Sequence, residues 1–136
     1  MEKAVFSLEE VNNEKQFEAL SLATFQFQYE ENSVYRSFCD LLNISPVDIN
    51  SLTQIPHLPI QFFKLCKVKA FNGKAAICFS SSATSGQGIS KHFVQDISLY
   101  QKSFRKGFAL HYGEVKQWAI LALLPSYLER EGTSLV

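Results

Sequence analysis

The sequence predicts an α/β fold, in which N-terminal helices precede a partial mixed sheet. Mainly apolar residues between Phe17 and Leu42 recur mostly at spacings of three and four, which is typical of amphipathic helices. Two short apolar runs, at residues 75–79 and 118–124, have the length and composition of strands. With 136 residues, 46% of them hydrophobic, the chain has the size and apolar content of one globular domain.

We therefore expect a single α/β domain over residues 1–136. Residues 1–54 are predicted to be helical and residues 55–64 to form a proline connector. Residues 65–136 are predicted to hold a β-hairpin, a polar loop, a helix and a central strand.

The helical part offers two starting points. Ser7 with Glu10, and Asn13 with Gln16, both have the spacing of a capping box. A break near Asn32 predicts two helices, or one long helix that is interrupted. The stripe along these helices is predicted to pack against the rest of the fold, and it comprises Phe17, Leu20, Thr24, Phe27, Val34, Phe38, Leu41 and Leu42.

Proline marks the next two segments. Ser45 followed by Pro46 and Asp48 predicts a short helix to about Leu52, with Ser as the N-cap and Pro at the first helical position. Residues 55–59 contain two prolines and are predicted to be extended. His57 stands alone there, which favours a packing or surface role over metal binding.

An Asn-Gly pair predicts the hairpin. Residues 66–70 alternate apolar and charged side chains, and Asn72-Gly73 separates them from the strand-like run at residues 74–79. Both Asn and Gly tolerate the positive φ of a type I′ turn, so these two runs are expected to pair.

A loop of small polar residues follows this hairpin and is the main candidate site. It contains Ser80, Ser81, Ser82, Thr84, Ser85, Gly86, Gly88 and Ser90. With a strand before it and a helix expected after it, the loop could present backbone N–H groups and hydroxyls to a phosphate. The Walker motif is incomplete, because Lys91 lies between Ser90 and His92 and not between Gly and Ser or Thr. The dinucleotide fingerprint is incomplete as well, because Lys91 stands where its third glycine should be. A mobile connector is the alternative interpretation.

The remainder is predicted to be a helix and a buried strand. Val94, Ile97, Phe104 and Phe108 share one helical face, Asp96 falls in the first turn, and Gly113 is expected just after the last turn. Residues 118–124 are apolar throughout, as in a central strand covered on both faces, and Pro125 should end it.

Composition narrows the classes of function. The formal net charge is zero, which gives no global field toward nucleic acid or an acidic membrane. Glutamates dominate before Asn32 and basic residues dominate from Arg36 to Lys116. The three cysteines, Cys39, Cys66 and Cys78, lack metal-ligand spacing, which favours no bound metal and a reduced, cytoplasmic protein. No apolar run is long enough to span a membrane.

Three segments together resemble the acyl-protein synthetase family, the LuxE-type subunit of the bacterial luminescence fatty-acid reductase. They are residues 79–86 with Ser90-Lys91-His92, residues 55–64, and the string at residues 124–136. That family is similar to adenylate-forming enzymes, in which ATP activates a fatty acid as an acyl adenylate before transfer to a thiol. The resemblance implies a fragment of the large domain of such an enzyme.

The same resemblance implies the site residues and ligands. Ser81, Ser82, Thr84, Ser85 and Gly86 would contact the phosphates of ATP, which Mg would accompany, and Lys91 or His92 would add positive charge. Pro125, Ser126 and Tyr127 would line the acyl-adenylate pocket. The chain departs from the family pattern at Ala83 and Ser85, where Gly and Thr are usual, and at Leu65-Cys66, where Thr-His is expected.

Family members are well over twice as long as this chain, so we expect it to be an N-terminal portion that is inactive alone. No catalytic residue is assigned. Its expected partners are a fatty acid or other carboxylic acid, and an acyl-CoA reductase-type subunit or a C-terminal half. The alternative is a non-catalytic, truncated or split subunit that binds a partner chain, or itself, through an exposed apolar face.

Overall fold

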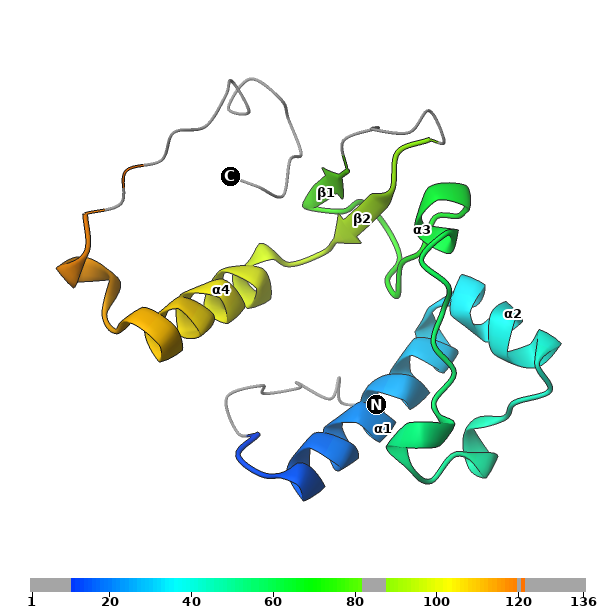
Figure 1. Ribbon diagram of the computed structural model, residues 1–136. Coiled ribbons are helices and arrows are strands. Elements are labelled where there is room, and N and C mark those ends of the chain that lie inside the picture. The colour runs from blue at the N-terminus through cyan, green and yellow to red at the C-terminus, as the bar shows by residue number, and fades with distance from the viewer. Residues whose placement is uncertain (1–10, 82–87, 120, 122–136) are drawn as a thin grey trace. The chain divides into compact units, whose positions relative to one another are not determined.

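The computed structural model describes residues 11–81, 88–119 and 121 (Figure 1). These residues combine helices with one small antiparallel sheet, which is compatible with the α/β class. Contacts divide the chain into two compact units. Unit 1 comprises Met1–Phe62 and Cys66–Phe71, and unit 2 comprises Phe63–Leu65 and Asn72–Val136. The single domain over residues 1–136 stays a prediction.

Two helices form most of unit 1. Helix α1 (Glu14–Glu31) begins after Asn13, whose side chain accepts a hydrogen bond from the Gln16 N–H, and helix α2 (Ser33–Leu41) follows Asn32. Both the second predicted helix start and the break near Asn32 are thus confirmed. The other predicted start, Ser7 with Glu10, lies outside the described residues.

The core of unit 1 consists of Phe25, Tyr35 and Cys39, with Phe38 and Ile55 among the partly buried residues around it. The rings of Phe25 and Tyr35 meet edge to face with 6.1 Å between centroids. The predicted stripe is therefore only partly correct, because Phe17, Leu41 and Leu42 are exposed while Phe25 and Tyr35 are buried. Residues one position away in the sequence project from a different side of the helix, about 100° around its axis.

The segment after α2 is less helical than predicted. A 3-10 turn over Pro46–Asp48 ends at Ile49, and Ser45 makes no side-chain capping bond. A second 3-10 turn covers Leu52–Gln54 and is closed by a capping box from Ser51. The predicted continuous helix to Leu52 is wrong, whereas residues 56–59 are in neither a helix nor a strand, as expected for a segment with two prolines. Helix α3 (Phe62–Leu65) then ends the connector.

The predicted Asn-Gly hairpin is wrong. Strand β1 (Ile77–Ser80) pairs with strand β2 (Lys91–Val94), and residues 66–70 are not in a strand. A type I′ turn needs positive φ at both central residues, but only Gly73 has one (88°). The backbone groups of β1 instead bond to β2, and an added bond from the Ala76 N–H to the Val94 carbonyl, at 2.8 Å, extends the ladder.

The polar loop therefore joins the two strands of the hairpin and is not followed directly by a helix. Helix α4 (Ile97–Tyr112) begins only after β2, so Val94 belongs to the strand and not to the helical face predicted for it. The predicted end is confirmed, because Gly113 follows Tyr112 with a φ of 77° and its N–H bonds to the Ala109 carbonyl. Asp96 is the N-cap of α4 and lies just before the first turn.

The predicted central strand at residues 118–124 lies mostly outside the described residues. Trp118, Ala119 and Leu121 are described, and none of them is in a strand. Leu121 is 97% exposed, which differs from the buried position predicted for it. A 3-10 turn over Val115–Gln117 precedes them. Among the described residues, no helix is both long enough and apolar enough to cross a membrane.

Candidate functional site

Two serines close the base of the polar loop. Ser81 directly follows β1, and its N–H donates to the Ser90 carbonyl at 3.1 Å. In return, the Ser90 N–H donates to the Ser81 side-chain oxygen, also at 3.1 Å. Because these bonds continue the ladder past Ser80 and Lys91, the loop starts from a fixed pair of residues. The signal in the sequence was the serine content, but the pairing of these two serines was not predicted.

Most of the predicted phosphate ligands cannot be placed. Ser82, Thr84, Ser85 and Gly86, together with the departure at Ala83, lie outside the described residues. The predicted acyl-adenylate residues Pro125, Ser126 and Tyr127 lie outside them as well. The described part of the predicted site is therefore Ser81, Lys91 and His92.

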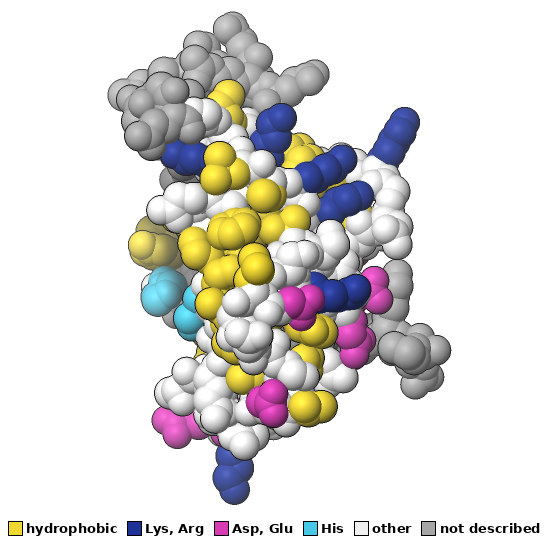
Figure 2. Space-filling model, turned by 90° about the vertical axis from the view of Figure 1, so that its right-hand side faces the viewer, with side chains coloured by type: hydrophobic (Ala, Val, Ile, Leu, Met, Phe, Trp, Pro, Cys, Tyr) yellow, Lys and Arg dark blue, Asp and Glu magenta, His cyan; other side chains and the backbone are white. Residues whose placement is uncertain are grey.

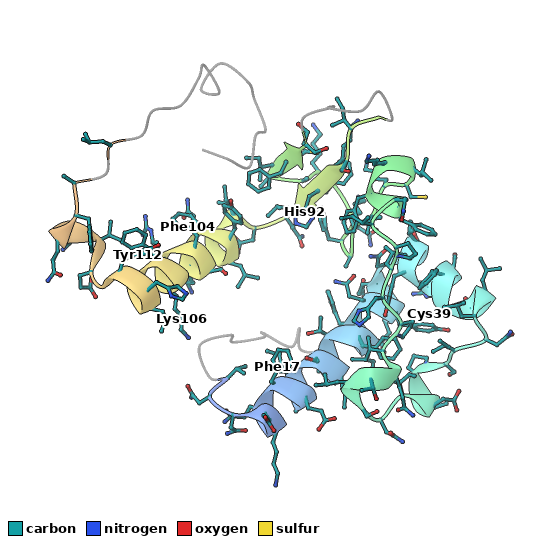
Figure 3. The ribbon with its side chains drawn as sticks, in the orientation of Figure 1. Phe17, Cys39, His92, Phe104, Lys106 and Tyr112 are labelled. Atoms are coloured by element: carbon teal, nitrogen blue, oxygen red, sulfur yellow. The ribbon has the colours of Figure 1, made fainter. Side chains whose placement is uncertain are left out.

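Lys91 and His92 lie on opposite faces of β2, because successive side chains alternate along a strand. Lys91 is paired with Ser80, and His92 with Phe79. Phe79 is largely buried, and its ring lies 5.0 Å from that of Tyr100 on α4. The His92 ring lies 6.2 Å from that of Phe63, and His92 shares its face of the hairpin with Phe79 (Figure 3). Lys91 is exposed on the other face, which it shares with its partner Ser80 and with Phe93.

The N-terminus of α4 is already capped by Asp96, so it is not free to bind an anion held by the loop. The Asp96 carboxylate accepts hydrogen bonds from the Ser98 N–H and the Ser98 hydroxyl, both at 2.8 Å. These bonds lower the pKa of Asp96, with the backbone N–H as the largest cause. An anion at this end would meet a negative charge, so the predicted contribution of a helix dipole to phosphate binding is not available here.

Unit 1 contains an open groove of about 540 Å³. One wall is a face of α1, and the other is the segment from Leu52 to Leu58. We call it the α1 groove, and it is lined by Phe17, Leu20, Ser21, Thr24, Phe25, Gln28, Tyr35, Leu52, Ile55, Pro56, His57 and Leu58. Phe17, Leu20 and Thr24 were predicted as a packing stripe, so the periodicity identified this face without showing that it borders an open groove.

Most polar side chains in the α1 groove already have partners. The Ser21 and Thr24 hydroxyls donate to the carbonyls of Phe17 and Leu20, each at 2.7 Å. The Tyr35 hydroxyl donates to the Pro56 carbonyl at 2.6 Å. His57 is exposed, and its side chain forms no hydrogen bond with any residue that the structure describes. The groove is thus mainly apolar, and His57 is the polar lining residue whose side chain has no hydrogen-bond partner in the part of the chain that the structure describes.

Burial changes the ionisation of the core beneath this groove. Desolvation raises the pKa of both the Tyr35 hydroxyl and the Cys39 thiol, and each group also lies beside the other. Cys39 is fully buried, while Cys66 is exposed and Cys78 is half-buried, and all three thiols are free. No cluster of His, Cys, Asp and Glu suited to a metal ion occurs in the described ranges.

Comparison with models of protein families shows to which family the chain belongs. A family model described as acyl-protein synthetase, LuxE, matches residues 1–118. The chain belongs to the LuxE acyl-protein synthetase family. Neither the curated proteins nor the solved structures contain a match to it.

The matched range of this LuxE family member includes the α1 groove, the connector and the polar loop. It ends before residues 124–136, although that string carried part of the resemblance in the sequence. Membership points to acyl-protein synthetase chemistry and therefore to an acyl substrate.

Proposed function

We propose that this LuxE family member takes part in the ATP-dependent activation of a fatty acid and its transfer to a thiol. In this proposal the polar loop holds the phosphates of ATP, with Mg²⁺ as the counter-ion of the nucleotide. The proposed phosphate ligands are Ser81, Ser82, Thr84, Ser85, Gly86 and Lys91. Pro125, Ser126 and Tyr127 are proposed to line the pocket for the acyl adenylate.

The closed base of the loop carries this proposal. Ser81 and Ser90 fix both ends of the loop, and Ser81 retains its own hydroxyl proton as a donor for a phosphate oxygen. Small residues between these ends allow a close approach of backbone N–H groups to an anion. Lys91 adds an exposed positive charge one residue beyond Ser90.

Formation of the acyl adenylate needs these donors, because negative charge develops on the departing pyrophosphate. The fatty-acid carboxylate attacks the α-phosphate, the bond to the β-phosphate breaks, and pyrophosphate leaves with its electrons. Positive charge and N–H donors that face the phosphates stabilise this transfer. Of the two residues first considered as cations, we assign this role to Lys91, because the His92 ring already lies 6.2 Å from that of Phe63.

The proposal is tested by titrating the full chain with MgATP and with inorganic pyrophosphate in a calorimeter. We expect saturable binding of both ligands. Lys91→Ala should weaken it by about tenfold to a hundredfold, because a hydrogen bond to a charged group contributes about 1.5–3 kcal/mol. Ser81→Ala should weaken it by a smaller factor.

Lys106→Ala is the matched control, because Lys106 is an exposed lysine on α4 and projects from the helix away from Phe104 (Figure 3). It should leave the affinity unchanged. Equal losses in Lys91→Ala and Lys106→Ala would show attraction by general charge and would contradict a phosphate site at the loop.

Association with a partner chain is the second candidate function. No residue of α4 is buried, although the helix carries Tyr100, Phe104 and Leu110. Figure 2 presents the side that is on the right in Figure 1 rather than α4, and hydrophobic side chains, in yellow, reach the surface there as well. Exposed apolar side chains of this kind favour association.

A further inference from the structure

We propose that the α1 groove binds the alkyl chain of a fatty acid and that His57 contacts its carboxylate. The identification of the ligand as a fatty acid rests on the proposed function. The location of the site rests on the groove itself, which lies wholly within unit 1.

The walls of the groove suit an alkyl chain better than a polar ligand. Phe17, Leu20, Leu52, Ile55 and Leu58 supply aliphatic and aromatic surface. The hydroxyls of Ser21 and Thr24 are turned back to carbonyls of α1 and offer no free donor. A sugar or peptide placed here would lose hydrogen bonds to water without replacing them, whereas an alkyl chain loses none. The volume of about 540 Å³ is within the usual range for small-molecule sites.

The groove is already formed without a ligand. Pro56 and Pro59 restrict the backbone of the outer wall, and the bond from the Tyr35 hydroxyl to the Pro56 carbonyl ties this wall to α2. Tyr35 is itself buried against Phe25. Because little of this wall has to become ordered on binding, most of the free energy from burying the alkyl chain is retained as affinity.

His57 determines the orientation of a fatty acid in the groove. It is the one ionisable imidazole, guanidinium, amine or carboxyl group among the lining residues, so no carboxylate in the lining repels an anionic head group. Its ring N–H is a donor in either protonation state, and the protonated ring adds a positive charge. The alkyl chain therefore lies along Phe17 and Leu20, and the carboxylate reaches His57 at the exposed edge.

The test is a titration of the full chain with dodecanoate below its micellar concentration, without nucleotide, followed by backbone amide shifts. We expect shifts confined to α1 and residues 52–58. Affinity should rise from decanoate to dodecanoate by up to about fifteenfold, which is the limit for two fully buried methylenes. These measurements use the unchanged protein and do not depend on the folding of any variant.

A variant whose groove is filled by a larger side chain should bind dodecanoate weakly. Thr24→Trp places a large ring into the groove from an exposed helical position and should weaken dodecanoate binding at least about tenfold. Ala23→Trp is the matched control, because Ala23 is exposed on the same helix and does not line the groove. Equal affinity in both variants, or shifts located elsewhere, would overturn the proposal.

The head group is tested separately. The wild-type chain should prefer dodecanoate to dodecylammonium, and His57→Ala should reduce this preference severalfold. An unchanged preference would overturn the role of His57. Thr24→Trp should leave the affinity for pyrophosphate unaltered, so a failure at the groove and a failure at the polar loop give different results.

Discussion

Tyr35 shows how a single side chain joins segments that are far apart in the sequence. Its hydroxyl donates to the carbonyl of Pro56, and its ring packs against Phe25 and lies 6.5 Å from Phe38. The aromatic periodicity did not mark Tyr35, because the predicted stripe ran through Val34 and Phe38. The contact with Pro56 spans 21 residues, and no local pattern reports it.

Replacing Tyr35 by Phe should destabilise unit 1 by about 1–2 kcal/mol, since the Pro56 carbonyl loses its partner in a partly buried position. The midpoint of urea unfolding, followed by circular dichroism, measures this change. Tyr29→Phe is the matched control, because the bond from the Tyr29 hydroxyl to Asp40 is exposed. A larger effect at Tyr29 than at Tyr35 would contradict the assignment of the core.

Among the elements, the junction of α1 and α2 depends on Asn32. Its N–H donates to the Gln28 carbonyl at 2.9 Å, which closes α1. Its side-chain oxygen accepts from the Tyr35 N–H at 3.2 Å, which opens α2, while its amide donates to the Gln28 side chain at 3.0 Å. Asn32 is 4% exposed, so no water can take over these bonds without rearrangement.

Asn32→Ala should therefore lower the free energy of unfolding by about 1–2 kcal/mol, as expected for the loss of an N-cap. Asn32→Asp keeps the capping oxygen and should recover part of this loss. Asn50→Ala removes the same side chain at an exposed position with no capping role, and should change stability little. The three variants are compared by urea unfolding, and equal midpoints for Asn32→Ala and Asn50→Ala would exclude the capping role.

For the whole molecule, the exposed side of α4 determines its behaviour at high concentration. Phe104 is 52% exposed and Leu110 is 75% exposed. With a formal net charge of zero, little electrostatic repulsion opposes contact between copies. We expect sedimentation velocity to show reversible association that increases with protein concentration.

Phe104→Glu should shift this equilibrium toward monomer, because a carboxylate cannot enter an apolar contact without a partner. Ser103→Glu adds the same charge at a neighbouring exposed position and should have a smaller effect. A monomer at all concentrations would argue against an association surface on α4.

Local patterns in the sequence were sufficient for the helices of unit 1 and for the end of α4. Asn13 with Gln16, the break at Asn32 and Gly113 after α4 were all predicted correctly. Each of these features depends on backbone groups or side chains within a few residues, so the sequence contains the required information. The family resemblance was also carried by short strings of residues and was confirmed over residues 1–118.

Pairing and burial were decided by the tertiary structure. An Asn-Gly pair favours a hairpin only if no better partner exists, and β1 bonds to β2 across the polar loop instead. That pairing separates the helix start from the loop and places Lys91 and His92 on different faces. In unit 1, periodicity placed Phe17, Leu20 and Thr24 on one side of α1, but only the position of residues 52–58 makes that side a groove. Contacts between residues distant in the sequence depend on the whole fold, because many alternative partners satisfy the same local preferences.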